Sequence, residues 1–136
     1  MIKENSLKSR GGRDLENRFS RATSLKKLKG SLKPRFINEH GQEQIIDSDF
    51  CLHLKDEMLF FDLTTSFRSD RAKQKAYNGL CCKLMCHENK CYSFYIVVPD
   101  EEANKLTKRT KRFTLKGLDG VLSFTEAVRL IGQKRC

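Results

Sequence analysis

Two aspartates that lie thirteen positions apart, Asp49 and Asp62, are the residues of this chain best suited to metal chemistry. Carboxylate oxygens are the ligands that hard divalent cations such as Mg²⁺ prefer, especially where a phosphate supplies further ligands. Acidic residues in strands and turns more often serve only to hydrate a sheet edge or to cap a helix. The elements around the two aspartates therefore decide whether they can share one ion.

A β-hairpin is predicted to bring the two aspartates together. Residues 49–54 and 58–64 have the composition of strands, and the three charged residues between them are typical of a turn. If the turn is tight, residues whose numbers add up to about 111 or 112 lie opposite each other. Asp62 then lies beside Asp49 or Phe50. Two carboxylates distant in sequence would thus converge where the basic segment after the hairpin begins.

The chain is strongly basic, and its charge is unevenly distributed. The net charge is +10, with +8 in residues 1–35, −5 in residues 36–104 and +7 in residues 105–136. Two basic flanks around an acidic centre indicate a polyanion held by the flanks and a metal ion held in the middle. The alternative is that the basic ends are only solubilising tails.

Length and hydropathy favour a single domain. With 136 residues, 38% of them hydrophobic and 32% charged, the chain can form one modest core. We expect a mobile basic segment over residues 1–12 and one domain over residues 13–136. No apolar run approaches the roughly 20 residues of a membrane span, and the first residues lack the apolar stretch of a secretion signal. An intracellular protein, cytoplasmic or associated with the nucleoid or nucleus, is therefore expected.

The cysteines leave a second kind of site open. There are six of them, with two histidines nearby: Cys51, Cys81, Cys82, Cys86, Cys91, Cys136, His53 and His87. No CxxC pair occurs, and the spacing matches no common structural zinc pattern. Reduced thiols that act as small hydrophobic side chains are the favoured interpretation. A zinc-stabilised interaction domain built on residues 81–91 is the alternative.

Hydrophobic spacing predicts an α/β fold with a mixed central sheet flanked by helices. From Arg13 we expect a helix that buries Leu15 and Phe19 and ends at Gly30. A second helix should follow the hairpin, because three apolar residues recur there at helical spacing: Ala72, Ala76 and Leu80.

The last third of the chain adds further elements. Tyr92–Val98 is nearly all apolar, which is typical of a strand buried on both faces. Asp100–Leu106 is expected to be a short helix and Phe113–Leu115 a last strand. A capping box over Ser123–Glu126 predicts a helix over residues 124–131.

The order of these elements resembles the PD-(D/E)xK superfamily of restriction-endonuclease-like nucleases. The shared pattern is a strand pair with a first aspartate, a second acid thirteen residues later and then a basic helix. Residues 65–74, TSFRSDRAKQ, look much like the T-S-x-R-x-R-x-K-Q stretch that follows the motif in several restriction enzymes. The likeness covers roughly residues 10–100. It implies an αβββαβ core and Mg²⁺-dependent cleavage of nucleic acid.

The resemblance assigns roles to matching residues. Asp49, or else Asp47, takes the place of the first aspartate, and Asp62 that of the second acid. Both are then expected to hold Mg²⁺, with Mn²⁺ as an alternative ion. Glu16, on the leading helix, is similar to the glutamate that sometimes joins the metal site. The lysine of the family motif is replaced by Thr64, which can position a water molecule but carries no charge.

The missing lysine directs attention to other basic residues. Some members of the superfamily supply the basic group from the following helix, which makes Lys73 and Lys75 catalytic candidates here and Lys55 a weaker one. Contacts with phosphates or bases are expected from a further set of polar residues: Arg68, Arg71, Gln74, Lys108, Arg109, Lys111 and Arg112.

The expected function is that of a Mg²⁺-dependent endodeoxyribonuclease, either restriction-type or junction-resolving, that acts on DNA as a homodimer. Two other classes stay open. One is a catalytically inactive nucleic-acid-binding protein, which the threonine at position 64 favours. The other is the zinc-stabilised interaction domain.

Overall fold

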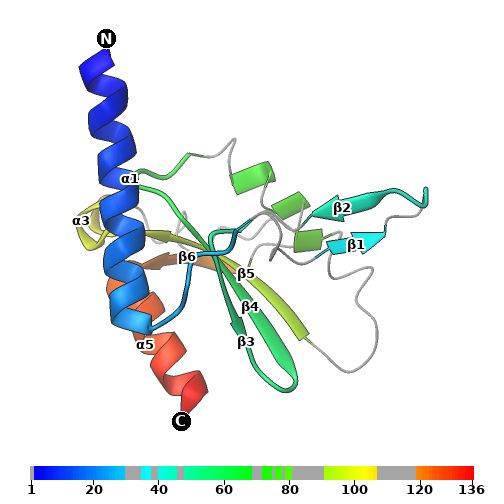
Figure 1. Ribbon diagram of the computed structural model, residues 1–136. Helices are drawn as coiled ribbons and strands as arrows, with labels where there is room; N and C mark the ends of the chain where they lie inside the picture. The colour runs from blue at the N-terminus through cyan, green and yellow to red at the C-terminus, as the bar shows by residue number, and fades with distance from the viewer. Residues whose placement is uncertain are drawn as a thin grey trace.

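The computed structural model describes residues 2–29, 35–37, 40–45, 48–68, 72–74, 76–77, 79–80, 91–106 and 119–136. The elements in chain order are α1 (Ile2–Thr23), β1 (Arg35–Ile37), β2 (Glu43–Ile45), β3 (Phe50–His53), β4 (Glu57–Leu63), β5 (Cys91–Val98), α3 (Asp100–Lys105), β6 (Gly120–Ser123) and α5 (Phe124–Arg135). Helical residues also occur at 72–74, 76–77 and 79–80, and we call these the post-hairpin helical residues. In Figure 1, α1 and α5 lie side by side, and the β1–β2 pair lies on the side of the molecule away from α1.

A mixed sheet of four strands, in the order β3-β4-β5-β6, forms the centre of the described fold. β3 and β4 are antiparallel, while β5 runs parallel to β4 and β6 runs parallel to β5. The two central strands are the most apolar segments, as expected for strands that are covered on both faces. β1 and β2 pair with each other in a separate sheet of two strands.

The predicted hairpin is confirmed, and so is its register. β3 and β4 pair Phe50 with Phe61 and His53 with Met58, so that opposite residue numbers add up to 111. The turn is closed by a hydrogen bond of 2.8 Å from the Leu54 N–H to the Glu57 carbonyl. The turn is therefore tight enough to fix the pairing along the whole hairpin.

Helices cover both faces of the sheet, which confirms the predicted α/β class. On one face, Leu15 and Phe19 of α1 pack with Ala127 and Ile131 of α5 against the hairpin. On the other face, three small side chains pack against Phe60 of β4 and against residues of β5. They are Ala72 and Ala76 of the post-hairpin helical residues and Ala103 of α3. The hairpin is thus held between two helical layers.

The first helix has different ends from those predicted. It begins at Ile2 rather than Arg13, because a helix that is already nucleated gains one hydrogen bond for each residue added. It ends at Thr23 rather than near Gly30, since Ser24 adopts a positive φ of 60°. Arg135 of α5 donates a hydrogen bond to the Thr23 carbonyl. A distant contact therefore accompanies the end of a helix that local spacing would continue.

The C-terminal helix begins as predicted. The Ser123 side chain accepts a hydrogen bond of 3.0 Å from the Glu126 N–H, and the Glu126 carboxylate accepts one of 3.2 Å from the Ser123 N–H. The helix extends to Arg135, beyond the predicted end. The sequence analysis missed strand β6, and its proposed last strand at Phe113–Leu115 lies outside the described residues.

A further predicted element is confirmed within the described ranges, because a short helix covers Asp100–Lys105. None of the helices that the structure describes has the length and apolar composition needed to span a lipid bilayer.

Candidate active site

The open end of the β3–β4 hairpin sets Asp49 against Asp62. The paired residues begin at Phe50 and Phe61, and Asp49 and Asp62 are the next residues of the two segments beyond that pair. The Asp49 carboxylate accepts a hydrogen bond from the backbone N–H of Leu63, whose nitrogen is 2.9 Å from Oδ2. This contact holds the first acid next to the strand that carries the second.

The hydrogen bond to Asp49 has a cause in the strand geometry. Successive N–H groups of a strand point towards opposite neighbours, and the Thr64 N–H donates to the Val97 carbonyl of β5 at 3.0 Å. The Leu63 N–H therefore points towards the β3 side, beyond the first residue of that strand. The Asp49 side chain satisfies this donor where the ladder of backbone hydrogen bonds has ended. The orientation of the Asp49 carboxylate is fixed as a result.

A buried serine anchors the backbone just before Asp49. The Ser48 side chain is 2% exposed, and its hydroxyl oxygen lies 3.0 Å from the Phe61 carbonyl oxygen and 3.3 Å from that of Phe50. Asp62 is itself 6% exposed. Two buried polar side chains therefore lie at the same end of the hairpin as Asp49.

A lysine that the sequence analysis did not single out lies at the same edge of the sheet. Next to Lys27, the Leu28 N–H donates to the Asp49 carbonyl at 2.8 Å. The Lys27 ammonium nitrogen lies 2.8 Å from Oε2 of Glu16. The hydrogen bond to Glu16 raises the pKa of Lys27 above its ordinary 10.5, and the charges of Glu16, Asp49 and Asp62 act in the same direction, against the opposing effect of burial.

These four side chains form a cluster with a surplus of negative charge, which we call the acidic cluster: Glu16, Lys27, Asp49 and Asp62. In the part of the chain that the structure describes, no group of three or more His, Cys, Asp or Glu side chains is arranged to hold a metal ion. Mg²⁺ commonly binds through one or two carboxylates, several waters and a substrate phosphate. The pair Asp49 and Asp62 fits that requirement, whereas Glu16 as a third ligand stays a prediction, because its carboxylate pairs with Lys27.

Thr64, which the sequence resemblance places at the motif lysine, makes a local contact. The Thr64 hydroxyl donates to the Ser66 carbonyl at 2.7 Å, in the segment that follows β4. Its proton is thus directed to the backbone, and the side chain brings no charge. Among the residues that the structure describes, Lys27 brings a positive charge to the acidic cluster.

The post-hairpin helical residues turn their polar side chains to solvent. Ala72 and Ala76 are buried against the sheet, while Lys73 and Gln74 are exposed. The Ala72 N–H donates to the carbonyl of the exposed Arg68 at 3.0 Å. The roles predicted for these polar residues stay predictions. Several other predicted residues lie outside the described residues: Asp47, Arg71, Lys75, Cys81, Cys82, Cys86, Lys108, Arg109, Lys111 and Arg112.

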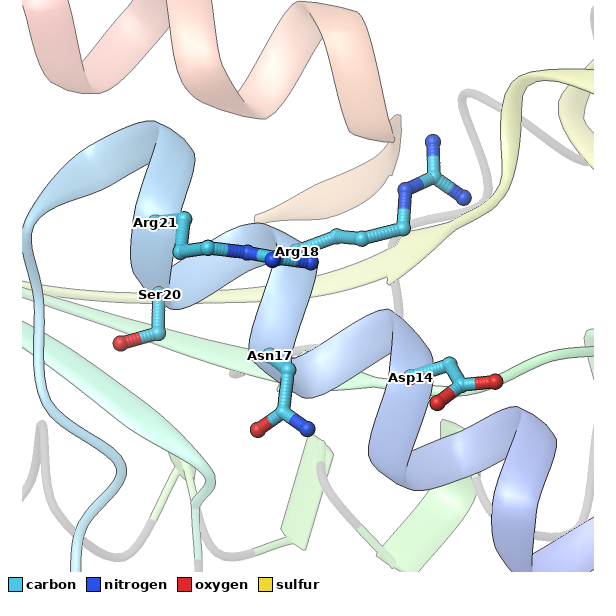
Figure 2. A pocket seen from close by; sticks show the side chains of 5 residues that line it. All are labelled: Asp14, Asn17, Arg18, Ser20 and Arg21. Carbon is cyan, nitrogen blue, oxygen red and sulfur yellow. The ribbon is translucent and has the colours of Figure 1, made fainter.

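A depression of about 500 Å³ lies along α1. The described residues that line it all belong to this helix: Asp14, Asn17, Arg18, Ser20 and Arg21. In Figure 2 the two arginine side chains extend in the same general direction from the helix. The Arg18 guanidinium also lies 5.1 Å from the centre of the Phe124 ring. The sequence analysis did not include these arginines among the candidate phosphate contacts.

Comparison of the chain with protein-family models, with curated proteins and with solved structures gives no match. The chemistry proposed for the acidic cluster is therefore based on its residues and their geometry.

Proposed function

We propose that this protein is a Mg²⁺-dependent endonuclease, restriction-type or junction-resolving, that hydrolyses phosphodiester bonds in DNA. Asp49 and Asp62 are the proposed ion ligands, with Mn²⁺ as an alternative ion. The observation that carries the proposal is the 2.9 Å hydrogen bond from the Leu63 N–H to Asp49, at the register position opposite the buried Asp62. Two oxygen-rich side chains are thereby held together beside a lysine, as phosphodiester hydrolysis needs.

The proposed reaction is a simple displacement at phosphorus. The oxygen of a water molecule forms the new bond to phosphorus while one ester P–O bond breaks. One proton of the water ends on the released hydroxyl oxygen, and the other is lost to solvent from the new phosphate monoester. When bound, Mg²⁺ would neutralise charge on the phosphate and lower the pKa of a coordinated water. Asp49 and Asp62 would hold it, and the Leu63 N–H keeps the Asp49 carboxylate in one orientation.

The order of elements also supports the proposal. A leading helix, the β3–β4 hairpin, the post-hairpin helical residues and a strand parallel to β4 follow one another, as in a restriction-endonuclease-like αβββαβ core. There is one departure. Such a core has three strands between its two helices, whereas in the described residues only β3 and β4 of the four-stranded sheet lie between α1 and the post-hairpin helical residues. The hairpin and its acids therefore carry more weight than the whole topology.

The charge around the site favours a nucleic-acid substrate. The chain carries a net charge of +10, and its exposed basic side chains include Lys29, Arg68 and Lys73. Such a surface can follow a phosphate backbone while the acidic cluster binds the ion. Each chain offers one such cluster, so cleavage of both strands of a duplex is proposed to use a homodimer.

A plasmid-cleavage assay tests the proposal directly. Supercoiled and linear DNA and a four-way junction are incubated with the protein in Mg²⁺, in Mn²⁺ and in EDTA. We expect cleavage in the metal ions only and its loss in Asp62→Asn. Asp56→Asn is a matched control, because it makes the same change of charge at the opposite, exposed end of the same hairpin. Equal activity of Asp62→Asn and Asp56→Asn would show that the site lies elsewhere.

One observation favours a second candidate, a nucleic-acid-binding protein without nuclease activity. Thr64 stands where the family keeps a lysine, and its hydroxyl proton is directed to Ser66. In that case the protein would bind DNA, yet no metal ion would support cleavage, and Asp62→Asn would bind as well as the wild type. The same assay, combined with a binding measurement, therefore separates the two candidates.

A further inference from the structure

We propose that Lys27 is the cation that contacts the reacting phosphate at the acidic cluster and thereby replaces the lysine missing at Thr64. This inference rests on the proposed function and deepens it, because it names the residue that would balance charge on the phosphate. It also moves the basic group from the helix after the hairpin, where Lys73 lies, to the segment that follows α1.

The backbone on both sides of Lys27 is fixed. On one side, Leu28 donates its N–H to the Asp49 carbonyl at 2.8 Å. On the other, the Leu25 N–H donates to the Thr23 hydroxyl at 3.2 Å and the Ser20 hydroxyl donates to the Leu25 carbonyl at 2.5 Å. Lys27 is thus held between two anchored points, directly beside the first proposed metal ligand.

The side chain of Lys27 is held but still accessible. Its nitrogen lies 2.8 Å from the Glu16 carboxylate, and 51% of the side chain is exposed, against 19% for Glu16. An ammonium group has three N–H donors. One of them serves Glu16, which leaves two for phosphate oxygens or for a water molecule. Lys27 can therefore meet a ligand that arrives from solvent without losing its partner.

The charges around Lys27 also favour this assignment. Its ammonium interacts favourably with Glu16, Asp49 and Asp62. A substrate phosphate bound by Asp49 and Asp62 through a metal ion would add negative charge at the place where Lys27 already lies.

The first test is a comparison of cleavage by three variants. Lys27→Ala should lower kcat by about 100-fold or more, which is the usual effect of losing a group that stabilises transition-state charge, with a much smaller change in KM. Lys27→Arg keeps the charge and should restore part of kcat. Lys26→Ala, an exposed neighbour with the same change of charge, should keep kcat within about threefold of the wild-type value, as expected when one screened surface charge is lost. Equal kcat values for Lys27→Ala and Lys26→Ala would overturn the inference.

A second test does not depend on cleavage. Binding of a short DNA duplex is measured in Ca²⁺ for the wild type and the same variants. Lys27→Ala should weaken binding several-fold more than Lys26→Ala and should lower the salt dependence of binding by about one phosphate contact. If none of the metal ions tested supports cleavage by the wild type, the proposed function fails. The binding comparison still decides the role of Lys27 in that case. Equal binding by the two variants would refute that role.

A loss of folding must be separated from a loss of function. Circular dichroism melting of each variant identifies any that does not fold. If Lys27→Ala is unfolded, Lys27→Met replaces it, because methionine retains most of the apolar stem of the lysine side chain. Lys27→Met is expected to give the same loss of kcat and of duplex binding as Lys27→Ala. Wild-type kcat and binding in this variant would contradict the proposal.

Discussion

Replacement of Asp49 by asparagine and by alanine should separate the structural role of this residue from its proposed role in metal binding. Asparagine retains an oxygen that can accept the hydrogen bond from the Leu63 N–H, and it removes one negative charge. Alanine removes both the acceptor and the charge. We expect Asp49→Asn to fold with nearly wild-type stability and Asp49→Ala to be clearly less stable, while neither variant responds to Mg²⁺.

The expected free energies follow from the geometry. A hydrogen bond to a charged group contributes about 1.5–3 kcal/mol and a neutral one about 0.5–1.5 kcal/mol, so asparagine loses about 1 kcal/mol. Side chains opposite each other on antiparallel strands lie close together, and like charges about 6 Å apart repel by about 1–3 kcal/mol. Relief of the repulsion with Asp62, reduced by the lost attraction to Lys27, offsets the weaker hydrogen bond. Alanine leaves the Leu63 N–H without its acceptor and should cost about 1–2 kcal/mol more than asparagine.

The assay is unfolding by urea, in EDTA and in Mg²⁺. At a Mg²⁺ concentration about ten times the Kd, wild-type protein should gain about 1.4 kcal/mol in the free energy of unfolding. Both Asp49 variants should show no such gain, whereas the control Asp56→Asn should gain as much as the wild type. The reasoning would be refuted by a wild-type Mg²⁺ response in Asp49→Asn. Equal stability of the two Asp49 variants in EDTA would also contradict it.

Three further predictions concern the elements that position the site. Phe19 is fully buried, and three phenylalanine ring centres lie 5.0 to 5.9 Å from the centre of its own ring. Phe19→Ala should therefore lower the free energy of unfolding, measured by urea denaturation, by about 3–5 kcal/mol. A loss below about 1 kcal/mol would argue against this packing. Ser24→Gly should raise the melting temperature through a gain of up to about 1 kcal/mol, because glycine adopts the positive φ of 60° without strain; an unchanged or lower melting temperature would contradict the proposed end of α1. Hydrogen bonds from the side chain and backbone of Thr125 lower the pKa of Asp100 below its ordinary 3.8. The ionised Asp100 carboxylate therefore stabilises the folded protein fully above pH 3.8, and this contribution is lost as the pH falls through the folded-state pKa. Thr125→Val should therefore reduce the loss of stability between neutral and acidic pH, as measured by urea unfolding across pH, and an unchanged pH profile would refute this link.

Local sequence was sufficient to predict the hairpin and its two acids. Three charged residues between two strand-forming segments define a tight turn, and a tight turn fixes which residues lie opposite each other. The register therefore agreed with the structure along all of β3. The capping box at Ser123 and Glu126 was predictable for the same reason, because its partners lie three residues apart.

Contacts between distant residues decided the rest of the site. At the end of α1, Arg135 donates a hydrogen bond to the Thr23 carbonyl, which joins residues 112 positions apart. Helical spacing alone extended that helix to Gly30 and so placed Lys27 on its surface. Only the early end of the helix, together with the Leu28–Asp49 hydrogen bond of 2.8 Å, brings Lys27 beside the two aspartates. The sequence by itself thus determined which two aspartates share the open end of the hairpin, because a hairpin is a local structure. Tertiary packing determined which positive charge meets them, because that charge comes from a segment that the hairpin does not contain.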